Sequence, residues 1–286
     1  MVKKSPHILL SALVILSLIV CTSPLAMAQD AKKIKQYGIT KDKIAAEKGE
    51  KGALKKNICI DPKLCDSIEI DLLNSLGEMK VVVFLPETKL GKADKESQAA
   101  LHLGVAVADA LASVTKKDKK NFLKNAALVQ KYGKQLGISA NTLGKYKAIT
   151  AAADKDQWDK LGLRLYEFKD GMINELNAKN KKALASLAMM SGGLEGFYIA
   201  AKSVSDKYSE KGAQLLDNQD LIPYLKNYMA TLPPELKNQP GVKALAASMP
   251  KLEKLMAGLE ANKYSQADVK KIVALAAAMR KNLTGS

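Results

Sequence analysis

Two stretches of this chain are apolar on nearly every side, and they restrict the possible folds more than any other feature. Residues 101–112 and 183–201 consist mostly of Ala, Leu, Val, Ile, Met and Gly. A helix that is apolar on all faces belongs at the centre of a helical bundle or in a membrane. The second stretch has membrane length, but three glycines, two serines and Glu195 weigh against insertion. Because small residues let backbones approach closely, we expect two central helices that cross tightly inside a bundle.

The rest of the 286-residue chain also predicts helices. Its apolar fraction of 47% is enough for a core, whereas the 5% of aromatic residues argue against a β-sandwich. The one strongly β-prone run, residues 79–85, has no second run to pair with, so we expect at most one short extended segment there, laid on helices. The sequence therefore predicts an all-α, multi-helix bundle with helices over residues 93–115, 118–136, 139–152, 155–178, 180–206, 210–230, 240–261 and 266–283.

The first 28 residues have the pattern of a secretory signal peptide. A basic start with Lys3 and Lys4 precedes an apolar run over residues 8–21, and an Ala-Met-Ala cleavage site ends at Ala28. Cleavage after Ala28 removes this run, which leaves no transmembrane anchor and predicts a periplasmic or secreted protein. A lipidated Cys21 is the alternative, although Val20 stands where lipoprotein signals have a small residue.

Only two cysteines, Cys59 and Cys65, remain after cleavage. They flank an Asp-Pro turn, and in an oxidising compartment this spacing favours a local disulfide. The alternative is half of a metal site, but the mature chain holds one His and no further Cys to complete it. Residues 29–57 are rich in Lys, Gly and Ala without a sustained apolar face, which predicts a basic flexible arm before a helical domain at 58–286.

His102, Asp109 and Glu195 are the candidate site residues, because each is ionisable within an otherwise apolar helix. A buried ionisable group must be paired or change its protonation state. His102 and Asp109 are seven residues apart and share one helix face, which Glu195 meets if the two apolar helices are neighbours. Three interpretations follow: a buried structural network, a polar pocket for a small ligand or cation, or a catalytic site. We expect Glu195 to be buried and to accept hydrogen bonds from another helix, with His102 as a candidate donor.

Two short motifs carry a resemblance to a known group of proteins. Residues 103–109 read Leu-Gly-Val-Ala-Val-Ala-Asp, and residues 192–196 read Gly-Gly-Leu-Glu-Gly, followed by Phe-Tyr. Over residues 65–206 the chain resembles exported all-helical bacterial proteins of unassigned function, which share an L-G-V-x-x-A-D helix and a later G-G-x-x-E-G helix. The later motif here has one residue between its Gly-Gly and Glu-Gly pairs. The resemblance implies a helical bundle and no particular activity.

Lysine dominates the charge of this chain. It has 45 basic and 29 acidic residues, a formal net charge of +16, and Arg164 and Arg280 as its only arginines. Bidentate reading of bases prefers arginine and base stacking needs aromatic residues, so specific nucleic-acid binding is not expected. The expected partners are anionic envelope components, namely lipid head groups, cell-wall polymers or an acidic protein. The alternative is a lysine-rich surface that serves solubility alone.

No catalytic motif is complete in this sequence. Residues 113–116 match S-x-x-K, but no K-T-G follows, and there is no Walker loop, G-x-S-x-G or H-E-x-x-H. The sequence therefore predicts an exported binding or structural module that is not an enzyme and uses no metal or cofactor. One alternative is a small-ligand or cation binder around Asp109 and Glu195, and a more remote one is an unrecognised hydrolase.

The local disulfide predicts a specific labelling result. Cys59 and Cys65 should resist a thiol alkylating reagent in the native, unreduced protein and should gain two labels after reduction, because a disulfide has no free thiol. Intact-mass measurement of the exported protein counts the labels. Labelling before reduction would contradict the disulfide.

Overall fold

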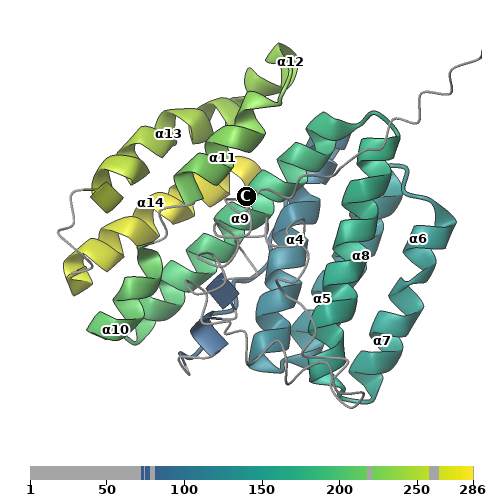
Figure 1. Cartoon of the computed structure of the whole chain (residues 1–286), viewed down its shortest axis with the longest axis horizontal. Helices are drawn as coiled ribbons and strands as arrows, with labels where there is room; N and C mark the ends of the chain where they lie inside the picture. The colour runs from purple at the N-terminus through teal and green to yellow at the C-terminus, as the bar shows by residue number, and fades with distance from the viewer. Residues whose placement is uncertain (1–71, 74, 78–80, 218–220, 258–263, 286) are drawn as a thin grey trace, which may run out of the picture. The chain divides into compact units, whose positions relative to one another are not determined.

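The computed structural model describes residues 72–73, 75–77, 81–217, 221–257 and 264–285 (Figure 1). The predicted signal peptide at 1–28, the arm at 29–57 and the pair Cys59 and Cys65 lie outside these residues and stay predictions. The described part contains helices and no strand, which confirms the all-α, multi-helix prediction. Its elements are α4 (Glu96–Lys116), α5 (Lys119–Gln135), α6 (Ala140–Gly144), α7 (Tyr146–Asp154), α8 (Trp158–Ala178), α9 (Lys182–Asp206), α10 (Glu210–Ala213), the 3₁₀ turn η1 (Gln214–Leu216), α11 (Leu221–Ala230), α12 (Pro234–Lys237), α13 (Pro240–Ala257) and α14 (Gln266–Thr284).

Side-chain caps set several helix starts where the sequence places them. The carboxylate of Asp118 accepts the Asn121 N–H at 3.0 Å, and Ser265 forms a reciprocal capping box with Asp268. The prediction of one continuous helix was wrong for two segments of the chain. The helix over 139–152 is divided after the exposed Gly144, a poor helix former, into α6 and α7. The helix over 210–230 is divided into α10, the 3₁₀ turn η1 and α11, which begins at Leu221.

Helices α4 and α9 are the two apolar stretches, and they pack against each other at the centre of the bundle (Figure 1). Helices α5 and α8 also contact α4, whereas α11 and α14 pack on α9 and α13 packs on α14. Both central helices are long and apolar enough to cross a membrane, yet 83% and 89% of these stretches are buried inside the structure. This burial is typical of the core helices of a bundle.

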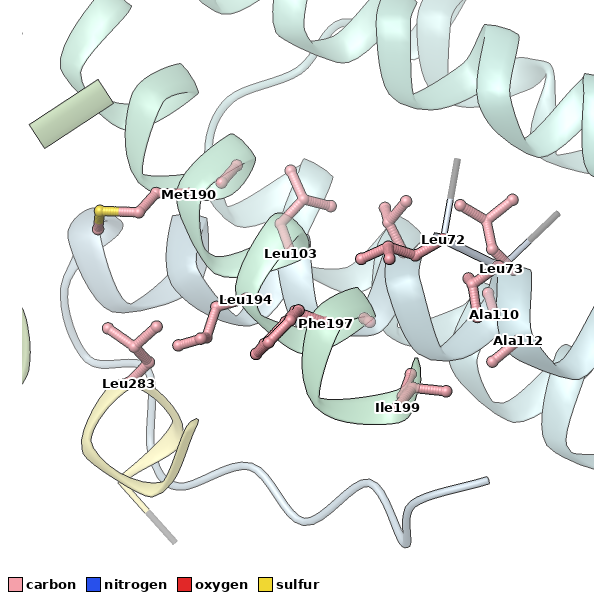
Figure 2. Packing of buried hydrophobic residues seen from close by; sticks show 14 of the residues in the cluster. Leu72, Leu73, Leu103, Ala110, Ala112, Met190, Leu194, Phe197, Ile199 and Leu283 are labelled. Atoms are coloured by element: carbon pink, nitrogen blue, oxygen red, sulfur yellow. The ribbon is translucent and has the colours of Figure 1, made fainter. Parts of the chain in front are cut away.

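The two central helices approach so closely that glycine is required at their contact. A β-carbon on Gly104 would lie 2.0 Å from the carbonyl oxygen of Ala188, and one on Gly192 would lie 3.3 Å from the Gly104 oxygen. At the same crossing, Ser191 Oγ donates to the Leu101 carbonyl at 2.8 Å. Figure 2 shows apolar side chains of this core, among them Leu103 on α4 and Met190 and Leu194 on α9. The expected tight crossing is confirmed.

Residues 81–94, which we call the covering segment, form neither helix nor strand and run across the central helices. The backbone N–H of Phe84 donates to Ser203 Oγ on α9 at 2.8 Å, and the N–H of Gly91 donates to the Thr284 oxygen of α14 at 3.0 Å. Between these two points, Thr88 contacts the side chains of α4 and α5. The described part of the β-prone run is therefore an extended segment laid on helices, as expected.

Substitution of Gly104 by alanine should destabilise the protein strongly. The added methyl group would overlap the backbone of α9, and overpacking of a tight core costs more than about 2 kcal/mol when backbone must move. The matched control is Gly144→Ala, because a β-carbon there meets no atom within 4 Å and the helix propensity improves. Urea unfolding of both variants measures the difference, and equal stabilities would contradict the packing.

Candidate functional site

The structure brings two of the three predicted site residues together. Asp109 on α4 and Glu195 on α9 are each 1% exposed. They lie close enough for their carboxyl groups to share a hydrogen bond when one of them is protonated. The tight crossing of the two helices causes this encounter, since each carboxylate belongs to a helix that is buried on every face. The expectation that Glu195 is buried and bonded to another helix is confirmed.

Arg280 of α14 is the hydrogen-bond donor to Glu195. Its Nε lies 2.7 Å from one carboxylate oxygen and 2.6 Å from the other, in an ion pair whose Glu195 side chain is fully buried. The guanidinium also lies over the ring of Tyr198, 5.6 Å from the ring centroid, which is a cation–π contact. The third charge of the cluster thus comes from 85 residues further along the chain.

Thr88 closes the cluster from the covering segment. Its hydroxyl oxygen lies 2.6 Å from Asp109 Oδ2 and 2.9 Å from Asn125 Oδ1 on α5, and it donates its single proton to one or the other. Asp109 Oδ1 and Arg280 Nη2 are buried and have no hydrogen-bond partner among the described residues. The cluster therefore draws on α4, α5, α9, α14 and the covering segment, and it ties these five parts together.

The electrostatics of the cluster favour one retained proton. Burial raises the pKa of Asp109 to about 6, against the opposing effects of the Thr88 hydrogen bond and the charge of Arg280. Burial, and next the charge of Asp109, also raise the pKa of Glu195, while Arg280 lowers it. Two carboxylates and one guanidinium would leave an unbalanced negative charge in the core, so a shared proton makes the group neutral.

His102 lies apart from this cluster, and its expected role as a donor to Glu195 was wrong. Its Nε2 donates to the backbone oxygen of Thr284 at 3.1 Å, and its ring packs edge-on against Tyr132. Arg280, which the sequence analysis noted only as one of two arginines, takes the place foreseen for His102. The available signal was that an arginine is rare in this lysine-rich chain and here follows an apolar run in α14.

Neither a metal cluster nor a relative explains this site. Within the described ranges, no three His, Cys, Asp or Glu side chains lie together in a way that could hold a metal ion. Comparisons of the chain with protein-family models, with curated proteins and with solved structures gave no match. The assignment of a role therefore rests on the geometry and the charges of the chain itself.

The raised pKa values predict how stability depends on pH. A carboxyl whose pKa is higher in the folded than in the unfolded state stabilises the protein at low pH, and this contribution is lost as the pH rises through the folded value. A rise of about two pKa units for Asp109 corresponds to about 3 kcal/mol. Asp109→Asn keeps the shape of the neutral acid and does not titrate. Between pH 4 and pH 8 its free energy of unfolding should therefore rise, relative to that of the unmodified protein, by up to about 3 kcal/mol.

Urea unfolding at pH 4, 6 and 8 measures this difference. The matched control is Asp156→Asn, which removes an exposed carboxylate and should follow the pH dependence of the unmodified protein. If Asp109→Asn and the unmodified protein kept a constant difference in stability across this range, the buried pair would not hold the extra proton.

Proposed function

We propose that this protein is exported to the periplasm or secreted, and that it works there as a non-enzymatic helical module that binds anionic envelope material through its lysines. The bundle provides a rigid body, and the Asp109–Glu195–Arg280 cluster stabilises its core. The observation that carries the proposal is the distribution of charge. The basic group of the cluster is an arginine, whereas the exposed basic groups of the described residues are lysines, of which seven form ion pairs and most of the others have no carboxylate partner.

The turn between α4 and α5 illustrates this distribution. It carries Lys116, Lys117, Lys119 and Lys120 within five residues, around the helix-capping carboxylate of Asp118. Of these lysines, only Lys119 forms an ion pair among the described residues, at 3.5 Å from Asp154. Unpaired lysines on this turn attract anionic surfaces in general. Their ammonium groups are point charges, which do not recognise a nucleic-acid base or a planar carboxylate by bidentate hydrogen bonds as arginine does.

The internal cluster favours a structural role over the binding of a cation. Arg280 already supplies the positive charge that a bound cation would bring to Glu195, and both carboxyl-bearing residues are 1% exposed. Thr88 and the covering segment close the remaining side. The proposal therefore places the binding function on the surface and gives the cluster the task of fixing the helices.

Binding to vesicles of phosphatidylglycerol tests the proposed function. We expect the protein to sediment with these vesicles at 0.05 M salt and not to sediment with vesicles of phosphatidylcholine, which have no net charge. Most of the binding should be lost at 0.5 M salt, because screening already acts within about 10 Å at 0.1 M salt. A variant with glutamine at the four lysines of the α4–α5 turn should bind more weakly. The control has the same net charge, with glutamine at Lys147, Lys211, Lys251 and Lys270. Binding that does not change with salt would contradict the proposal.

A further inference from the structure

The middle of the covering segment has one hydrogen-bonded attachment to the bundle. On either side of it, the N–H of Phe84 is bonded to α9 and the N–H of Gly91 is bonded to α14. Between these two anchors, Thr88 is the one residue of the described part that hydrogen-bonds to the helices. Its neighbours Glu87 and Lys89 are exposed and form an ion pair with each other at 2.9 Å. The hydrogen bonding of this part of the segment therefore depends on Thr88.

Thr88 stands between two oxygen atoms, which makes its hydrogen bonds sensitive to a proton. Its hydroxyl lies 2.6 Å from Asp109 Oδ2 and 2.9 Å from Asn125 Oδ1. If Asp109 carries a proton on Oδ2, it donates to Thr88 and Thr88 donates to Asn125, so both links are complete. If Asp109 is ionised, Thr88 faces two acceptors with a single proton to donate, and one link is lost.

The charges around Asp109 place the proton of the cluster on this residue. Arg280 Nε donates to both oxygens of Glu195, which favours the ionised form of Glu195. The other charges that act on Asp109 are Arg280 itself and the exposed Lys124 of α5. Burial raises the pKa of Tyr198, which is therefore uncharged at neutral pH, and the exposed ion pair of the covering segment has no net charge.

Loss of this proton would leave an unbalanced negative charge in the closed cluster. A buried charge without a partner is costly, and contact with water lowers that cost. Of the parts that meet at the cluster, α4, α5, α9 and α14 are long helices that pack on one another, whereas the covering segment is a single irregular strip of chain. The covering segment is thus the part that can move aside and admit water with the least loss of packing.

We propose that the covering segment is a pH-sensitive latch, which Thr88 holds against α4 and α5 while Asp109 keeps its proton and which detaches when that proton is lost. Burial raises the pKa of Asp109 in the closed state. The proton therefore stabilises the closed state at low pH, and this contribution is lost as the pH rises through the raised pKa. The inference goes beyond the proposed function, because the latch needs no ligand.

Hydrogen exchange of the Phe84 and Gly91 amides tests the latch, because both N–H groups are bonded to helices while the segment is attached. Their protection factors, corrected for the intrinsic pH dependence of exchange, should fall about tenfold or more between pH 5 and pH 8. Low concentrations of urea should hardly change them, since a short segment exposes little surface when it detaches. The amide of Phe197 in the core of α9 should be better protected and should respond to urea.

Two substitutions separate the proton from the hydroxyl. Asp109→Asn offers an N–H to Thr88 at every pH, so most of the fall in protection between pH 5 and pH 8 should disappear. The matched control Asp156→Asn removes an exposed carboxylate and should leave that fall unchanged. Thr88→Val should lower the protection of Phe84 and Gly91 about tenfold at pH 5, whereas Thr88→Ser keeps the hydroxyl and should lower it less than about threefold.

Three results would overturn the latch. The first is protection of Phe84 and Gly91 that does not change with pH. The second is exchange of these amides with the same protection and urea dependence as Phe197, because the segment would then open only when the whole protein unfolds. The third is an Asp109→Asn variant that keeps the full fall. None of these results involves the surface lysines, so the salt dependence of vesicle binding tests the proposed function separately.

Discussion

The close approach of α4 to α9 is the constraint on which the rest of the structure depends. Glycine at position 104 lets the Ala188 carbonyl occupy the space of a side chain, and glycine at position 192 keeps the opposite surface equally flat. This contact fixes the two helices in one register, with Ser191 bonded across it to Leu101. In that register Asp109 and Glu195 come together in the core. The glycines therefore determine the packing of the apolar helices and, as a consequence, where two carboxyl groups are buried.

Burial of these carboxyl groups requires partners, and the fold supplies them from distant segments. An unpaired buried charge costs several kcal/mol, so Glu195 needs Arg280 of α14, and Asp109 needs Thr88 of the covering segment. Apolar packing alone would tolerate small shifts of α14 and of the covering segment. The cluster does not, because Arg280 Nε donates to both oxygens of the buried Glu195, and a shift of α14 would leave that carboxylate unpaired. We infer that the cluster selects one arrangement of the outer elements around the core.

The sequence predicts the core of this fold well because all-round apolarity allows few arrangements, and it also predicts that Glu195 is buried. It does not predict the partner of Glu195, since Arg280 lies 85 residues away in α14 and nothing local connects the two. The reasoning from spacing failed for His102. A separation of seven residues places His102 and Asp109 on one face but about 10 Å apart along the axis. On a helix that is buried all round, each position meets a different neighbour, Thr284 for His102 and Thr88 for Asp109.

The end of α14 connects the buried cluster to the first turns of α4 and to the covering segment. Arg280 lies one turn before Thr284, and the Thr284 hydroxyl donates back to the Arg280 carbonyl at 3.1 Å. A helix carries partial negative charge at its carboxyl end, where the last carbonyl groups need hydrogen-bond donors. Here the Thr284 carbonyl already accepts from His102 Nε2 and from the Gly91 N–H, and the charge of Arg280 is nearby. The negative end of α14 is thus satisfied within the protein, by donors from α4 and from the covering segment.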